Sequence, residues 1–128
     1  MGKNKVYLYD TYFDEKQGIS VVGLMTPQGL FSGKAQLNTD EDQWNEITGG
    51  SIAELRAWKA YYKYEIRVRK FALHELETVY SQMRKTKACT RILDRIEILK
   101  LEIDQCMNEL AGVDKEIDAR IERLGKKN

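Results

Sequence analysis

Three short segments near the start of the chain have the residue pattern of β-strands. They span residues 6–9, 19–25 and 30–37 and are rich in β-branched and aromatic side chains, which favour strands. Residues 14–18, between the first two segments, are typical of a turn, and the Thr-Pro-Gln-Gly sequence at 26–29 favours a type I turn. The pattern therefore predicts a three-stranded antiparallel meander. Such a sheet must be covered by a helix or by another copy of itself.

Helices are predicted after the strands. Thr39 and Asp42 resemble a capping box for a short helix that runs through Ile47 and ends at Thr48-Gly49-Gly50. Ser51 and Glu54 form a stronger capping box, because they follow two glycines and precede a long apolar-periodic segment. We therefore expect a long helix from Ser51 to about Lys85.

Apolar residues of this first long helix recur at spacings of three, four or seven, and Lys59 and Arg69 interrupt the stripe that they form. A second helix is predicted from Thr90, which could cap it, and the stretch 84–90 before it is a turn or a kink. The second helix has an apolar heptad seam of Ile92, Ile96, Leu99, Ile103, Cys106, Leu110, Val113 and Ile117. The seam is expected to pack on the first helix, on another chain, or on both.

The predicted architecture is an α+β fold, with a β-rich head over residues 1–50 and a long helical region over residues 51–128. We expect the helices to form a helical hairpin or a bent coiled coil and the chain to form a homo-oligomer. The oligomer number is not predicted, because a mixed seam of Ile, Leu, Cys and Val does not select one state.

The composition favours a binding protein over an enzyme. His74 is the one histidine, and no nucleophile with a local signature accompanies it, while the glycines form neither GxGxxG nor a P-loop. Cys89 and Cys106 lack metal-ligand spacing and are expected to be buried thiols. We expect no catalytic residues, no metal and no cofactor. No stretch approaches the roughly 18 apolar residues of a membrane span, so a cytosolic protein is expected.

Positive charge is concentrated in the middle third of the chain. Residues 56–95 hold 11 basic and 4 acidic residues, a net charge of +7, whereas the flanking segments are acidic. Arg91 and Arg95 are one helical turn apart, so both guanidinium groups could converge on one phosphate or pyrophosphate. Aromatic residues near the basic ones, among them Trp58 and Tyr62, could stack on a nucleobase. Two other interpretations stay open, namely that these aromatics are core residues covering the sheet and that the basic residues only solvate the turn.

Several sequence strings resemble the phage anti-Thoeris sponges. They are Lys5-Val6-Tyr7-Leu8-Tyr9-Asp10-Thr11-Tyr12, Gly33-Lys34-Ala35 and the stretch from Thr48 to Ala57, and the resemblance covers roughly residues 5–65. It implies a β head with long bent helices, and an oligomer that sequesters a cyclic ADP-ribose signal without cleaving it. The family binds its ligand with an aromatic, an asparagine and paired arginines. Arg91 and Arg95 are comparable to the arginines, but the asparagine has no evident match.

The sequence therefore leads us to expect a non-enzymatic phage protein of the host bacterial cytoplasm that binds a phosphorylated cyclic nucleotide at subunit interfaces. The expected ligand-binding residues are Arg91, Arg95, Lys87, Trp58, Tyr62 and Lys34. An alternative is a phage protein whose helices bind and inhibit a host protein, such as a defence nuclease, with no small-molecule ligand. Nucleic-acid binding is less favoured, because the acidic head and tail would repel a long polyanion.

Overall fold

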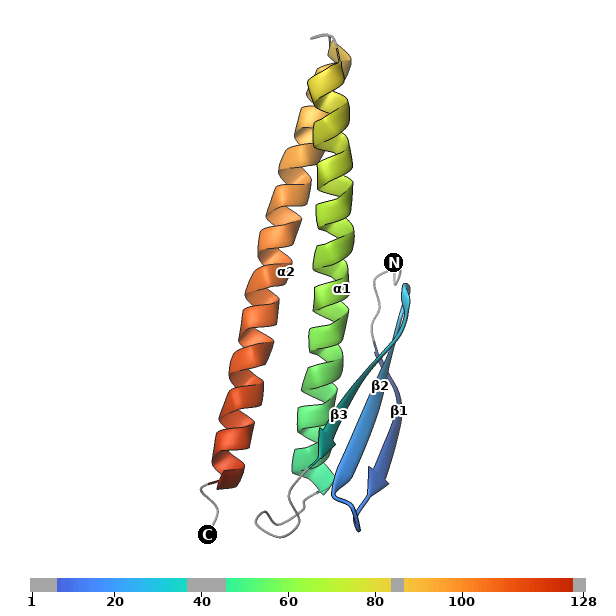
Figure 1. Ribbon diagram of the computed structural model, residues 1–128, viewed down its shortest axis with the longest axis vertical. Helices are drawn as coiled ribbons and strands as arrows, with labels where there is room; N and C mark the ends of the chain where they lie inside the picture. Colours follow the sequence, from blue (N-terminus) through green and yellow to red (C-terminus); the bar gives the residue numbers. More distant parts are fainter. Residues whose placement is uncertain (1–6, 37–45, 84–86, 126–128) are drawn as a thin grey trace. The chain divides into compact units, whose positions relative to one another are not determined.

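The computed structural model describes residues 7–36, 46–83 and 87–125 and has the predicted α+β class. Three strands are followed in chain order by two long helices (Figure 1). The elements are β1 (Tyr7–Asp14), β2 (Ile19–Thr26), β3 (Gly29–Gln36), α1 (Glu46–Gln82) and α2 (Lys87–Gly125).

The three strands form the predicted antiparallel meander in the order β1-β2-β3. Thr11 pairs with Val22, and Val22 pairs in turn with Gly33. In the β2-β3 turn, the hydroxyl of Thr26 accepts a hydrogen bond from the Gln28 amide (3.1 Å) and donates one to the Gly29 carbonyl (2.8 Å). β1 extends to Asp14, beyond the predicted end at residue 9, and its register shifts between Leu8 and Asp10. Such a bulge interrupts regular alternation, which is why the pattern gave too short a strand.

One face of the sheet packs against the start of α1. Along β2, buried and half-buried residues alternate, and the core cluster joins Val22 and Ala35 of the sheet to Ile52 and Ala53 of α1. The contact is close at Gly33. A Cβ atom there would overlap the Ala53 carbonyl oxygen and the Ala57 amide nitrogen. Glycine on the strand and alanines on the helix therefore let sheet and helix approach each other at this point.

The predicted break in the first helix at Gly49 and Gly50 is wrong, because α1 is continuous from Glu46 to Gln82. A Cβ atom at Gly50 would lie 3.1 Å from Cε1 of Phe13, so the glycine makes room for a side chain of β1. Ser51 is not an N-cap, and its hydroxyl instead accepts a hydrogen bond from Arg120 of α2. The short helix predicted before this point lies mostly in residues 37–45, outside the described residues.

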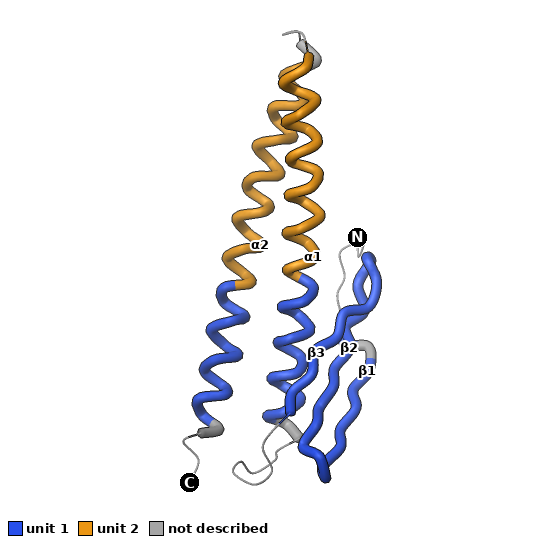
Figure 2. Tube along the Cα trace, viewed as in Figure 1, with its two compact units in different colours: residues 1–61, 111–128 blue, residues 62–110 orange. Residues whose placement is uncertain are grey.

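The chain divides into two compact units (Figure 2). Unit 1 comprises residues 1–61 and 111–128, so it holds the sheet, the first part of α1 and the last part of α2. Within it the two helices are joined by an ion pair between Lys59 and Asp114 (2.8 Å) as well as by the bond from Arg120 to Ser51. Lys59, which interrupts the apolar stripe in the sequence, thus has a partner on α2.

Unit 2 comprises residues 62–110 and consists of the two remaining helix segments. In it, an ion pair between Arg69 and Glu102 (3.2 Å) joins α1 to α2. The connection predicted as a turn or a kink includes residues 84–86, which lie outside the described residues. α2 already begins at Lys87, which places the predicted cap Thr90 inside the helix.

Four of the eight residues of the predicted heptad seam of α2 are buried, and the other four are half-buried. In unit 2, Ile96, Leu99 and Ile103 are 4–6% exposed, and Ile117 in unit 1 is 6% exposed. Cys89 is also buried, as expected, whereas Cys106 is half-buried and not buried as expected, and neither forms a disulfide. The buried residues of the seam are thus covered by other parts of the same chain, which is one of the expected packings.

Candidate ligand-binding site

The paired arginines lie in the first turns of α2. Arg91 and Arg95 are both exposed and stand four residues apart, so their side chains project from the same side of the helix. Within the described residues, neither arginine forms an ion pair or a side-chain hydrogen bond. Their guanidinium groups are thus available to an anion.

The local electrostatics of unit 2 also favour an anion at this place. The first turn of α2 contains no acidic residue, and the amino end of a helix carries a partial positive charge from its unpaired N–H groups. Lys87 is the first residue of α2, so its backbone belongs to this end. Asp94, exposed on the following turn, is the nearest acidic residue of α2 and reduces the net charge without pairing with either arginine among the described contacts. Arg84 and Lys85, which the sequence also placed at this basic elbow, lie outside the described residues.

Trp58 packs as part of an aromatic cluster in unit 1. Its ring meets that of Tyr61 edge to face, with centroids 5.9 Å apart, and Tyr61 meets Phe31 of β3 in the same way at 5.6 Å. Such edge-to-face pairs add stability beyond the area that they bury. Tyr61 thus joins α1 to the sheet, and the half-buried Trp58 packs beside it on the same helix.

Tyr62 and Lys34 are not brought to the arginines by the described contacts of one chain. Tyr62 is half-buried on α1, and the 20 residues from it to Gln82 correspond to about 30 Å of helix, so within unit 2 it lies far from the turn that precedes Arg91. Lys34 belongs to unit 1, has an exposed side chain and pairs with Val21 in the sheet. Its carbonyl oxygen accepts a hydrogen bond from Nη1 of Arg56 at 2.8 Å.

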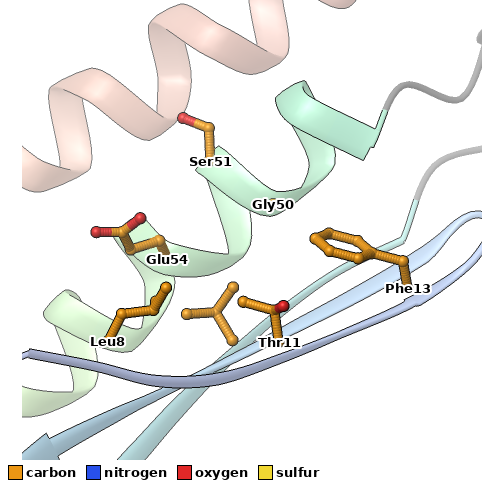
Figure 3. Close-up of a pocket in the computed structure, with 7 residues that line it drawn as sticks. Leu8, Thr11, Phe13, Gly50, Ser51 and Glu54 are labelled. Atoms are coloured by element: carbon orange, nitrogen blue, oxygen red, sulfur yellow. The ribbon is translucent and has the colours of Figure 1, made fainter.

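A cleft that the sequence did not reveal opens in unit 1 between β1 and the start of α1 (Figure 3). Its volume is about 360 Å³. The lining is mainly apolar, with three polar side chains, and comprises Leu8, Thr11, Phe13, Val22, Gly50, Ser51 and Glu54. Because we read the glycines before Ser51 as a helix end, the helix face that forms one wall of this cleft was not recognised. The sequence signal that could have revealed this cleft was the spacing of Thr11 and Phe13, which lie two residues apart beyond the predicted end of β1 and so share one face of the strand.

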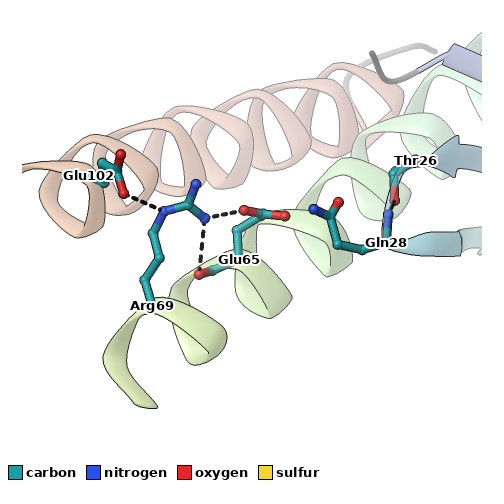
Figure 4. A network of polar contacts seen from close by, with 5 residues as sticks. All are labelled: Thr26, Gln28, Glu65, Arg69 and Glu102. Atoms are coloured by element: carbon teal, nitrogen blue, oxygen red, sulfur yellow. Dashed lines mark hydrogen bonds and ion pairs between the residues drawn. The ribbon is translucent and has the colours of Figure 1, made fainter. Parts of the chain in front are cut away.

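A second feature that the sequence only hinted at is a polar cluster inside the helix pair of unit 2 (Figure 4). Glu65 is 7% exposed, and its carboxylate pairs with Nη1 of Arg69, whose Nε donates to Glu102 of α2. Burial lowers the pKa of Arg69, but the hydrogen bonds and charges of Glu65 and Glu102 outweigh it and leave the pKa raised. Burial raises the pKa of the Cys106 thiol, against the opposing charge of Arg69. Through Glu102, Arg69 of this cluster joins α1 to α2.

We found no protein family, curated protein or solved structure that matches this chain. Among the described residues, no group of three or more His, Cys, Asp or Glu side chains is placed to hold a metal ion. None of the helices, over the residues that the structure describes, has a segment both long and apolar enough to span a membrane.

Proposed function

We propose that this chain is a non-enzymatic phage protein of the host bacterial cytoplasm that binds and sequesters a phosphorylated cyclic nucleotide signal of the cyclic ADP-ribose type. The observation that carries the proposal is the exposed pair Arg91 and Arg95 at the amino end of α2, with no ion-pair partner among the described residues. Two guanidinium forks one turn apart match the several oxygens of a pyrophosphate. The resemblance of residues 5–65 to phage anti-Thoeris sponges supports the same ligand class.

The aromatic part of the pocket is proposed to come from another copy of the chain. Tyr62 stands about 30 Å along the helix from the turn before Arg91, and a nucleotide spans much less than that distance. A Tyr62 ring that stacks on a base bound near the arginines of one copy must therefore come from a neighbouring copy. This arrangement accounts for the expected location of the ligand at subunit interfaces.

Native mass spectrometry with cyclic ADP-ribose tests the proposal. We expect a bound ligand of unchanged mass that is released intact on denaturation, because a sponge holds its ligand without cleaving it. Arg91→Ala and Arg95→Ala should each weaken binding by roughly 10-fold to 100-fold, the value of a lost charge-assisted hydrogen bond of about 1.5–3 kcal/mol. Arg123→Ala, at another exposed arginine of α2, is the matched control and should bind as the wild type does.

Two results would contradict the proposal. One is the absence of binding by cyclic ADP-ribose and by other cyclic nucleotides at millimolar concentration. The other is recovery of a cleaved product, which would make the protein an enzyme.

A second candidate function, inhibition of a host protein through the helices, is favoured by exposed apolar side chains on both helices. Phe71 of α1 is 68% exposed and Leu101 of α2 is 69% exposed. Large exposed apolar groups mark surfaces that bind proteins when they are contiguous. A pull-down from host lysate that recovers one stoichiometric partner, and whose yield is unchanged in Arg91→Ala, would favour this candidate over the first.

A further inference from the structure

We infer that the cleft of unit 1 between β1 and α1 binds a small organic cation, namely an amine whose apolar body fills the cleft and whose ammonium group pairs with Glu54. All residues that line this cleft belong to unit 1, and its charge preference is opposite to that of Arg91 and Arg95. The inference therefore stands or falls independently of the proposed function.

The cleft exists because α1 covers the sheet unevenly. At Gly33 of β3 the main chain of α1 is so close that a Cβ atom would overlap it, and Val22 of the central strand is 2% exposed. β1 is the opposite edge of the sheet. Leu8 of this strand pairs with Leu24, so it shares the face that α1 covers, yet it is 51% exposed. The inner face of β1 is thus partly uncovered, and this surface forms the floor of the cleft.

The walls of the cleft come from both elements. Thr11 pairs with Val22 in the sheet, so their side chains lie together on the floor. Gly50 and Glu54 are one turn apart and present one face of α1. A Cβ atom on Gly50 would lie 3.1 Å from the Phe13 ring, so this ring packs closely against the helix at one end of the cleft. Figure 3 shows Glu54 at the other end.

The size and lining of the cleft suit a small molecule with an apolar body. Its volume of about 360 Å³ is at the lower end of the roughly 300–1,000 Å³ of small-molecule sites. Leu8, Phe13 and Val22 offer apolar surface to a hydrocarbon or an aromatic ring. Because Leu8 is half in water, a bound ligand is only partly enclosed, and we expect a modest affinity.

Glu54 determines the charge of the ligand, because it is the one charged residue of the lining. Its side chain is exposed and, within the described residues, takes part in no ion pair. Arg120 of α2 also reaches the lining, where it donates to the Ser51 hydroxyl, but its ion pair is with Glu116 (3.1 Å). An ammonium group at this end of the cleft is therefore attracted by a carboxylate, whereas an anionic ligand is repelled.

The rest of the lining favours an organic cation over a metal ion. Calcium and magnesium take several oxygen ligands, whereas this lining has one carboxylate among mostly apolar side chains. The Thr11 hydroxyl can accept a further hydrogen bond from an ammonium group, which has three donors. The backbone N–H of Thr11 already donates to the Asp10 carboxylate at 2.8 Å, so that acidic group is engaged outside the cleft lining.

An NMR titration of the isotopically labelled full chain with phenethylamine tests the inference. We expect chemical-shift changes at the main-chain amides of the cleft lining and a dissociation constant of about a millimolar, because a ligand of this size in an open cleft gains little binding energy. Phenethyl alcohol, its neutral counterpart, should bind more weakly, and the anion phenylacetate should not bind.

Three variants separate the charge from the cavity. Glu54→Gln should weaken phenethylamine binding by roughly 3-fold to 10-fold, between the value of an exposed ion pair and that of a charge-assisted hydrogen bond. Thr11→Phe keeps a residue that favours strands but fills the cleft, so it should abolish binding. Glu75→Gln, at an exposed carboxylate of α1 in unit 2, is the matched control and should bind as the wild type does. Circular dichroism verifies that all three variants stay folded.

Two kinds of result would overturn the inference. Equal affinity for phenethylamine, phenethyl alcohol and phenylacetate, or an unchanged affinity in Glu54→Gln, would refute the preference for a cation. No shift changes in the lining of the wild-type chain, or unchanged binding in Thr11→Phe, would refute the cleft as the binding site.

Discussion

Gly33 is the position at which one added methyl group should damage the fold of unit 1 most. In Gly33→Ala, the new Cβ would overlap the carbonyl oxygen of Ala53 and the amide nitrogen of Ala57, and would lie 2.8 Å from the carbonyl carbon of Arg56. All three atoms belong to the main chain of α1, which is held by helical hydrogen bonds and cannot rotate away as a side chain would. The sheet must therefore move off the helix to admit the methyl group.

The size of the effect follows from what such a movement uncovers. Overpacking commonly costs about 1–3 kcal/mol, and a clash with rigid main chain belongs at or above the upper end of that range. Movement of β3 also loosens the cluster of Val22, Ala35, Ile52 and Ala53. We expect Gly33→Ala to lower the free energy of unfolding by about 3 kcal/mol or more, a large share of the 5–15 kcal/mol of a typical domain.

Urea unfolding followed by circular dichroism measures this change, and Gly23→Ala is its matched control. Gly23 lies on the adjacent strand β2, and a Cβ there would meet only the Asp10 carbonyl oxygen, at an ordinary 3.9 Å. The control should unfold within about 0.5 kcal/mol of the wild type. If Gly33→Ala unfolded at the same urea concentration as Gly23→Ala, the close packing of sheet on helix described above would be incorrect.

Three further changes have clear expected outcomes. Gly112→Ala should raise the free energy of unfolding by about 1 kcal/mol in the same assay, because Gly112 is inside α2 with nothing within 4 Å of an added Cβ; a loss of stability would contradict this. Glu65→Ala should lower the free energy of unfolding by about 1.5–3 kcal/mol, since Arg69 loses its most buried charged partner. An unchanged urea midpoint would contradict this and show that the ion pair with Glu102 alone stabilises Arg69. Because the folded state raises the Cys106 pKa, the folded chain holds the thiol proton more tightly, so this contribution to stability is present below the ordinary pKa of 9.0 and is lost as the pH rises through the raised value. Cys106→Ala should remove that loss in unfolding curves measured across this range, so that at neutral pH only the pH-independent effect of the smaller side chain separates the two proteins.

The sequence predicted the elements whose pattern is regular. The seam of α2 repeats in heptads, and its central residues Ile96, Leu99 and Ile103 are buried as the period requires. The meander was predicted with its strand order because β-branched runs alternate with strong turn sequences. Lys59 and Arg69 were correctly seen to interrupt the stripe of α1, and both have acidic partners on α2.

The errors arose where tertiary contacts overrode local signals. Gly49 and Gly50 have low intrinsic helix propensity, yet α1 passes through them because Gly50 leaves room for Phe13 of β1. No local rule reveals a partner 37 residues away in sequence. For the same reason the cleft beside Ser51 and Glu54 was not predicted.

For the candidate site, the structure bears only on which elements hold the predicted residues. Spacing alone placed Arg91 and Arg95 on one side of a helix, and the structure agrees. Spacing could not show that Tyr61, one turn from Trp58, packs on Phe31 of β3, because that contact joins residues far apart in the sequence.

The short connection between Gln82 and Lys87 also bears on how the chain folds. Contacts that close across so few residues form in about 10–100 ns, whereas the pairing of Gly33 with Ala53 and Ala57 must wait for a longer loop. The two helices of unit 2 are therefore expected to meet first near their ends at Gln82 and Lys87. Arg91 and Arg95 sit where that process starts, so their alanine variants should be compared with the wild type for refolding rate as well as for affinity.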